Sequence, residues 1–195
     1  TTLYPLSFQE WIWGIDSTLH LNPNLDEPSH IDELATYNKL LPDFMRFGAL
    51  PALLSFPDEL TKREYLLEIY KTYIAKDIKS FLKEESILSF NKMISWLALN
   101  NGSLLNKHNL SGITNISARQ IDRYLEILQG TYVLALVPPF FTNKVKELVK
   151  TNKFYLYDQG VLNTIIQDFR PLELRPDAGI IRETFVFWEL KKHAD

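Results

Sequence analysis

Three polar residues between Ser117 and Gly130 have the types and the spacing of a surface that contacts nucleic acid. Arg119, Gln120 and Arg123 share one side of any helix that covers this stretch. The apolar residues between them form a stripe that we expect to face the core: Ala118, Ile121, Leu125 and Leu128. Arginine and amide side chains turned outward from such a helix contact phosphates and base edges. The pattern therefore predicts a DNA-contacting helix face.

Positive charge gathers in the same part of the chain. Residues 87–157 hold eight basic and three acidic residues, which gives +5 in a chain whose net charge is −3. Residues 1–86 come to −6 and residues 158–195 to −2. A basic block between acidic segments is typical of a nucleic-acid contact surface. The alternative interpretation is an ordinary solvated polar face.

Further candidates lie on both sides of this helix. The complete nucleic-acid-binding set that we predict is Lys107, Ser117, Arg119, Gln120, Arg123, Lys144 and Lys146. If about four to six basic residues neutralise phosphates, log K falls with log salt at a slope of roughly −4 to −5. Asp122 and Glu126 flank Arg123, which argues against base reading. We therefore expect weak contact with duplex DNA without strong sequence preference.

The elements that would position these side chains follow one another in a recognisable order. The pattern predicts helices over 87–99, 107–111 and 118–129, then strands over 132–137 and 153–157. Asn106 and Ser117 are expected to cap two of the helices, Asn100-Asn101-Gly102 to end the first in a left-handed conformation, and Gly112 to stop the second. This order is that of a winged helix-turn-helix, in which 140–152 would be the wing.

The first third of the chain is predicted to be helical. Ser7 and Glu10 have the spacing of a capping box, so a helix starts at Phe8. A second helix is expected over 31–41, closed by Pro42. A long helix over 58–81 is predicted from an apolar stripe that includes Leu60 and Leu67. The predicted fold class is mainly α with a small β-wing.

Short stretches along nearly the whole chain carry a family resemblance. They are Leu3–Glu10, Arg46–Pro51, Tyr73–Ile78, Tyr124–Leu128, Lys153–Gly160 and Glu183–Leu190. Their order and spacing resemble the C-terminal region of a prokaryotic AAA-type P-loop ATP-binding protein family. In that family an ATPase module is followed by a winged helix and then by a nuclease-like domain of unknown function. Gly48-Ala49 departs from the two glycines more usual there, which puts the tight turn in doubt.

The resemblance implies how the chain is divided. Residues 1–85 would be a helical lid after an absent ATPase core, 86–158 the winged helix-turn-helix, and 159–195 the start of a truncated α/β nuclease-like domain. Both chain ends are accordingly expected to be cut. ATP and magnesium would belong to the parent protein. No Gly-x4-Gly-Lys-Ser/Thr phosphate loop occurs in this chain, so we expect no cofactor bound to it.

We predict neither a catalytic residue nor a metal site in this chain. Glu183 sits where the nuclease-like fold has its first acidic residue, but its later metal-binding partners are missing, and a helix N-terminal carboxylate is the plainer interpretation. Asp158 is read either as a strand-end catalytic carboxylate or as a helix cap. Lys76-Asp77 is read either as a nucleotide sensor of the parent or as structural. The four histidines lack metal-ligand spacing. The fragment is expected not to be an enzyme, whereas its parent would be an ATPase.

Composition limits the setting and the partners. The chain has no cysteine, no signal peptide pattern and no apolar run of membrane-spanning length, so a cytoplasmic protein without membrane contact is expected. Expected partners are duplex DNA and the ATPase module of the same chain, and a homo-oligomer is compatible with the sequence. The alternative function is an interdomain or subunit scaffold without DNA binding, with Phe140, Phe141 and Trp188 on its contact surface. A free-standing transcription regulator is less favoured.

Overall fold

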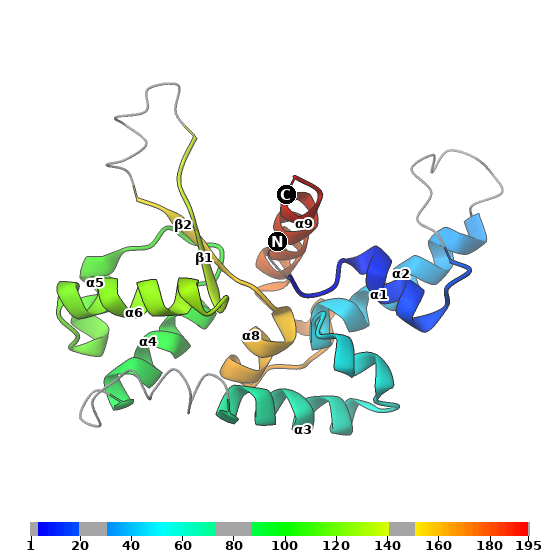
Figure 1. Ribbon diagram of the computed structural model, residues 1–195, viewed down its shortest axis with the longest axis horizontal. Coiled ribbons are helices and arrows are strands. Elements are labelled where there is room, and N and C mark those ends of the chain that lie inside the picture. The colour runs from blue at the N-terminus through cyan, green and yellow to red at the C-terminus, as the bar shows by residue number, and fades with distance from the viewer. Residues whose placement is uncertain (1–3, 20–30, 73–86, 141–150, 195) are drawn as a thin grey trace. The chain divides into compact units, whose positions relative to one another are not determined.

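The chain forms two compact units in a computed structural model that describes residues 4–19, 31–72, 87–140 and 151–194 (Figure 1). Unit 1 comprises residues 1–67 and 158–195, and unit 2 comprises residues 68–157. In sequence, unit 2 is thus inserted into unit 1. The division at residues 85 and 158 stays a prediction, and the structure adds that residues 158–195 share one unit with the first 67 residues.

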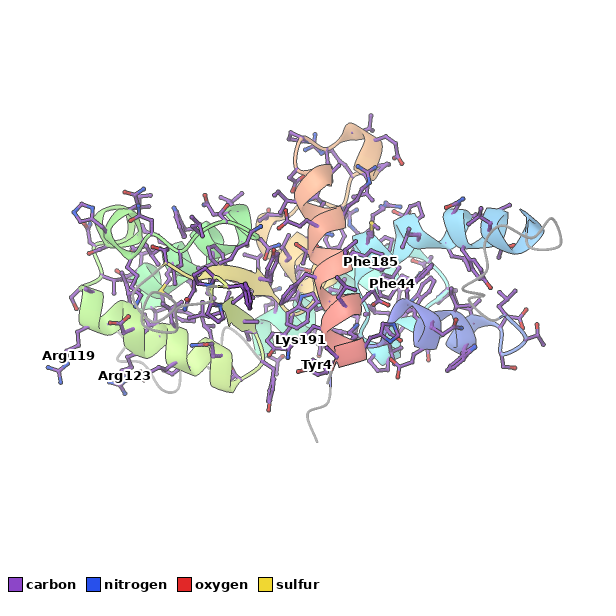
Figure 2. All side chains as sticks on the ribbon, turned by 90° about the horizontal axis from the view of Figure 1, so that it is seen from above. Tyr4, Phe44, Arg119, Arg123, Phe185 and Lys191 are labelled. Carbon is purple, nitrogen blue, oxygen red and sulfur yellow. The ribbon has the colours of Figure 1, made fainter. Side chains whose placement is uncertain are left out.

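Unit 1 is helical in its described residues. Its elements are α1 (Phe8–Ile15), α2 (Ile31–Phe47), the 3-10 turn η2 (Pro51–Ser55), α3 (Glu59–Ile69), α8 (Gln159–Ile166), the 3-10 turn η5 (Leu172–Leu174) and α9 (Ala178–Ala194). Aromatic rings from three helices make its core. The ring of Phe44 lies 5.2 Å from that of Phe8 and 5.8 Å from that of Phe185, in both cases edge to face. Phe44 and Phe185 are labelled in Figure 2. Edge-to-face pairs stabilise a core beyond the area that they bury.

Helix α2 does not stop at Pro42, so the predicted end at residue 41 was wrong. Proline inside a helix removes one hydrogen bond and costs about 3 kcal/mol. Here the helix continues because residues on both sides of Pro42 enter one core: Tyr37 precedes it, Phe44 follows it, and both pack with Phe8 and Trp11. Burial of these aromatic side chains outweighs the local preference of proline.

The other predictions for unit 1 have mixed outcomes. The Ser7–Glu10 capping box is present and α1 begins at Phe8, as expected. Helix α3 begins at Glu59, close to the predicted start, but its buried residue is Leu66. The predicted stripe was wrong at Leu60 and Leu67, which are exposed. Residues 73–81 of the predicted long helix lie outside the described residues.

In its described residues, unit 2 combines helices with a small antiparallel sheet (Figure 1). Its elements are α4 (Ile87–Leu99), α5 (Lys107–Thr114), α6 (Ala118–Gly130), β1 (Leu134–Val137) and β2 (Lys153–Leu156). Strands β1 and β2 pair antiparallel, with Leu134 opposite Leu156. Residues 102–105 run along the other edge of β2, where Gly102 donates to the Phe154 carbonyl and Leu104 bridges Lys153. The prediction of a mainly helical chain with a small β element is confirmed.

The core of unit 2 joins helices α4, α5 and α6 to the sheet. Phe90 of α4 meets Tyr124 of α6 edge to face at 5.6 Å, and Trp96 stacks on Phe154 of β2 at 6.1 Å. Fully buried aliphatic residues complete the core: Met93, Ile94, Leu97, Leu110, Ile121 and Leu128. Because α6 supplies two of these residues, its rotation about its own axis is fixed by packing.

Two helix ends in unit 2 test the expected capping. Gly102 has φ +76°, which agrees with the left-handed end predicted after α4. Helix α5, however, continues through Gly112 to Thr114, so the predicted stop at Gly112 was wrong. Thr114 is buried and its hydroxyl donates to the Leu110 carbonyl, which anchors this last turn. The helix ends instead at Asn115, whose φ of 58° is left-handed.

Candidate nucleic-acid interface

Helix α6 presents its cationic side to solvent. Ile121, Tyr124, Leu125 and Leu128 are buried, whereas Arg119, Gln120 and Arg123 are exposed. The predicted rotation of the helix is therefore confirmed. One residue of the predicted apolar stripe was wrong: Ala118, the first residue of α6, is exposed, and the buried residues of the helix begin at Ile121.

Arg119 and Arg123 lie on one face of α6 and point away from it (Figure 2). They are four residues apart, so they are neighbours on the helix surface. Neither guanidinium has a hydrogen bond or an ion pair within the part of the chain that the structure describes. As far as the described residues go, the N–H donors of both guanidinium groups are available to an external anion.

Ser117 and Gln120, by contrast, use their polar atoms within the protein. The Ser117 hydroxyl donates to Gln120 Oε1 at 2.9 Å and accepts from the Gln120 backbone N–H at 3.3 Å. Gln120 Oε1 also accepts from the Ser117 backbone N–H at 3.3 Å. This capping box starts α6, and a base contact that uses the Ser117 hydroxyl or Gln120 Oε1 would break it.

Lys107 is held by an acidic residue of the neighbouring helix. Its Nζ lies 2.5 Å from Asp122 Oδ1, and both side chains are about half exposed, at 49% and 50%. Lys107 is the first residue of α5, and Asp122 lies between Arg119 and Arg123 on α6. The sequence suggested Asp122 as a neighbour of Arg123. Its pairing with Lys107, 15 residues away, gave no signal in the sequence because it depends on how α5 packs against α6.

The remaining predicted contacts fall on the proposed wing. Lys144 and Lys146 lie outside the described residues, so the structure neither adds them to this interface nor removes them. The described interface thus consists of the exposed Arg119 and Arg123, the paired Lys107, and the carboxylates Asp122 and Glu126.

Asp158 in unit 1 is a helix cap with a second structural task. Its Oδ1 accepts from the Val161 backbone N–H at 2.9 Å, which caps α8, and its Oδ2 accepts from the Ala49 N–H at 2.8 Å. Burial raises the pKa of this carboxyl, and the three backbone donors Ala49, Val161 and Gly160 oppose that rise. Of its two interpretations, the cap is the one that the structure bears out.

A buried arginine that sequence reasoning missed organises the segment after α8. The Arg175 guanidinium is fully buried and makes two hydrogen bonds to Asp177, at 2.9 and 2.6 Å, and one of 2.7 Å to Asn163 Oδ1. It also donates to the Asp168 carbonyl at 2.6 Å. A buried guanidinium whose N–H groups are paired with acceptors in this way has a structural role. Spacing alone could not single it out among the five basic residues of the C-terminal segment.

The other predicted residues of chemical interest can now be placed. Glu183 lies in α9, and no group of three His, Asp or Glu side chains able to hold a metal occurs among the described residues. Lys76 and Asp77 lie outside the described residues, as does Phe141. Phe140 is exposed, as the scaffold alternative expects. Trp188, however, is only 5% exposed, so its assignment to an exposed contact surface was wrong. It packs against Tyr4 and Phe187.

Comparison with known proteins places the chain in a family. Residues 38–172 match the model described as Domain of unknown function (DUF8612), and the chain belongs to that family. An uncharacterized protein of Methanocaldococcus jannaschii is 27% identical over 201 residues, an alignment that covers 98% of this chain. The chain spans 41% of the length of that relative. No solved structure matches the chain.

Among the described residues, no helix has both the length and the apolar character required to cross a bilayer.

Proposed function

We propose that unit 2 is a winged helix-turn-helix that contacts duplex DNA weakly and without strong sequence preference. The observation that carries this proposal is the pair Arg119 and Arg123, which are exposed on the outward face of α6 and have no ion pair among the described residues (Figure 2). Helix α6 would be the recognition helix, which in such modules lies against the major groove.

The order of elements supports this assignment. The elements of unit 2 follow one another as helix α4, the segment 102–105 with its single bridge to β2, helices α5 and α6, and strands β1 and β2. Strand β2 lies between β1 and the 102–105 segment. The chain between β1 and β2, which carries Lys144 and Lys146, would be the wing.

The side chains at the interface favour the DNA backbone over the bases. Arginine is a strong phosphate ligand, and phosphate contacts carry no sequence information. Ser117 and Gln120, which could otherwise read base edges, are engaged in the capping box. Asp122 and Glu126 also repel phosphates that approach α6. These features support weak binding that tolerates any sequence.

By resemblance, the chain would be the C-terminal part of a prokaryotic AAA-type ATP-binding protein. Residues 1–85 would be the helical lid, and residues 159–195 the start of the nuclease-like domain. The archaeal relative, of which this chain spans 41%, has length enough for a further module. ATP, magnesium and a cytoplasmic setting belong to this proposed parent, and the fragment itself would be non-catalytic.

Fluorescence anisotropy with a labelled duplex tests the proposal. The Arg119→Glu/Arg123→Glu variant should lose binding at low salt, because reversal of two charges replaces attraction of phosphate by repulsion. A matched control, Lys39→Glu/Arg182→Glu, changes the net charge equally at exposed positions of unit 1 and should bind as the wild type does. Equal loss in both variants would mean that only net charge matters and would overturn the assignment to α6.

A second candidate function is an interaction scaffold. A groove of about 350 Å³ on α4 and α5 is lined by Leu88, Trp96, Leu99 and Ile113, and Leu88 and Leu99 are 68% and 72% exposed. Apolar side chains grouped in this way are typical of a protein contact. Light scattering distinguishes the two functions: a scaffold self-associates with rising concentration, Leu88→Asp/Leu99→Asp abolishes that association, and Leu190→Asp, at another exposed leucine, does not.

A further inference from the structure

Lys107 belongs to the outward surface of unit 2, although it comes from a different helix than the two arginines. Its ammonium group reaches Asp122, which lies on α6 one residue before Arg123 and three residues after Arg119. On a helix, residues three apart are neighbours, so the Asp122 carboxylate borders the arginine face. The Lys107 ammonium is therefore at the edge of the same face.

The ion pair changes what this lysine can do. In the described structure the positive charge of Lys107 is balanced by Asp122 at 2.5 Å. A phosphate that binds Lys107 must displace this carboxylate, and it must also approach the carboxylate's own negative charge. Because both side chains are half exposed, the pair contributes little to folding and can open without disturbing the core.

We propose that Asp122 is an internal competitor of DNA phosphate that restrains Lys107 and thereby limits the DNA affinity of unit 2. This inference rests on the proposed DNA contact of α6. It assigns Lys107 as a latent phosphate ligand, and it assigns to Asp122 a regulatory role that the charge pattern of α6 alone does not show. Neutralising Asp122 releases Lys107 and adds one phosphate contact.

The salt dependence of binding is the direct readout. Asp122→Asn in the 195-residue chain should bind a labelled duplex about threefold to tenfold more tightly at low salt. Its slope of log K against log salt should be steeper than that of the wild type by about 1, since each added phosphate contact contributes about 0.9. Asparagine nearly matches aspartate in size and helix propensity, so circular dichroism should show the same helical content.

A double-mutant cycle separates release of Lys107 from a simple loss of negative charge. Lys107→Gln should leave the slope unchanged when Asp122 is present, and should lower it by about 1 in the Asp122→Asn background. Glu126→Gln is the matched control, because it removes a carboxylate from the same helix that has no lysine partner in the described residues. This control should tighten binding without a coupling to Lys107.

The outcomes distinguish the inference from the function on which it rests. A steeper slope in Asp122→Asn that Lys107→Gln reverses supports the inference. Binding that depends on Arg119 and Arg123, with equal slopes for wild type and Asp122→Asn, overturns the inference alone. Absence of DNA binding in every variant, Asp122→Asn included, overturns both.

Discussion

A methyl group on Gly160 would collide with the backbone of the last residue of α2. A Cβ at this position would lie 1.9 Å from the Phe47 carbonyl oxygen. Rigid backbone cannot give way as a flexible side chain can, so Gly160→Ala should destabilise unit 1 by about 3 kcal/mol. Urea denaturation followed by the fluorescence of the unit 1 tryptophans measures this change.

Gly112 provides the matched control for this prediction. It lies within α5, and among the described residues a Cβ there meets no atom within 4 Å beyond the backbone of its own helix. Gly112→Ala should therefore raise stability by about 0.5 to 1 kcal/mol, because alanine favours a helix over glycine. If both alanine variants changed stability alike, the close approach of Gly160 to Phe47 would not be a feature of the folded chain.

Asp168 should make folding sensitive to acid. Hydrogen bonds from Arg170, together with the nearby Arg175 charge, lower the pKa of the Asp168 carboxyl to about 2. A carboxyl whose pKa is lower in the folded than in the unfolded state stabilises the fold above the unfolded pKa of about 3.9, and this stability is lost as the pH falls towards 2. We expect Asp168→Asn to reduce stability near pH 7 by about 1 kcal/mol, a figure discounted for solvent screening.

The pH dependence of that difference is the decisive measurement. Urea midpoints of wild type and Asp168→Asn should converge as the pH falls from about 4 to about 2, because the wild-type carboxylate becomes protonated. A difference between the two proteins that stays constant over this range would show that Asp168 acts through the shape of its side chain and not through its charge.

At the scale of elements, the start of α6 depends on one hydroxyl group. Ser117 caps the helix through its bonds with Gln120. Ser117→Ala should destabilise unit 2 by about 1 kcal/mol, the usual effect of losing such a cap. Trp96 is the single tryptophan of unit 2, so its fluorescence during urea denaturation measures the change. Ser103→Ala, at an exposed serine outside any helix, should leave the midpoint unchanged.

Elements that local sequence determines were predictable, and those that packing determines were not. The caps at Ser7, Asn106 and Ser117 were all found, because a cap needs only residues a few positions apart. The helix ends expected at Pro42 and Gly112 were wrong, because burial of Phe44 and Thr114 extends both helices past residues that disfavour them. Where tertiary contacts stabilise further helical residues, they outweigh the local preference for ending the helix.

In the candidate interface, too, features set by local sequence were predictable and features set by packing were not. The exposure of Arg119 and Arg123 was predictable from the apolar stripe on the opposite side of α6. The restraint on Lys107 was not, since it joins residues of two helices whose relative placement is set by core residues such as Leu110 and Ile121. Sequence patterns of helical period report one helix at a time.

For the whole molecule, the insertion of unit 2 between Leu67 and Asp158 is the feature that the linear sequence conceals. The three segments expected from the resemblance follow one another along the chain. The compact units are defined by contacts, and one of them joins residues from both ends of the chain. Residues after Asp158 join unit 1 because Asp158 binds the Ala49 N–H and Asn163 Nδ2 donates to the Arg46 carbonyl at 2.8 Å. Hydrogen bonds between residues more than 100 positions apart produce no periodic pattern in the sequence.

An inserted unit with its own core should fold alone. Unit 2 buries aromatic and aliphatic residues from all of its described helices and strands, and a core of this kind allows a domain to be stable in isolation. A polypeptide of residues 68–157 should therefore unfold cooperatively in urea, with Trp96 reporting loss of its stacking on Phe154. In the full chain, Trp96→Phe should remove the fluorescence transition of unit 2 and leave the transition that the tryptophans of unit 1 report. Gradual unfolding of the isolated polypeptide, beside a cooperative Trp96 transition in the full chain, would mean that unit 2 needs unit 1 to fold.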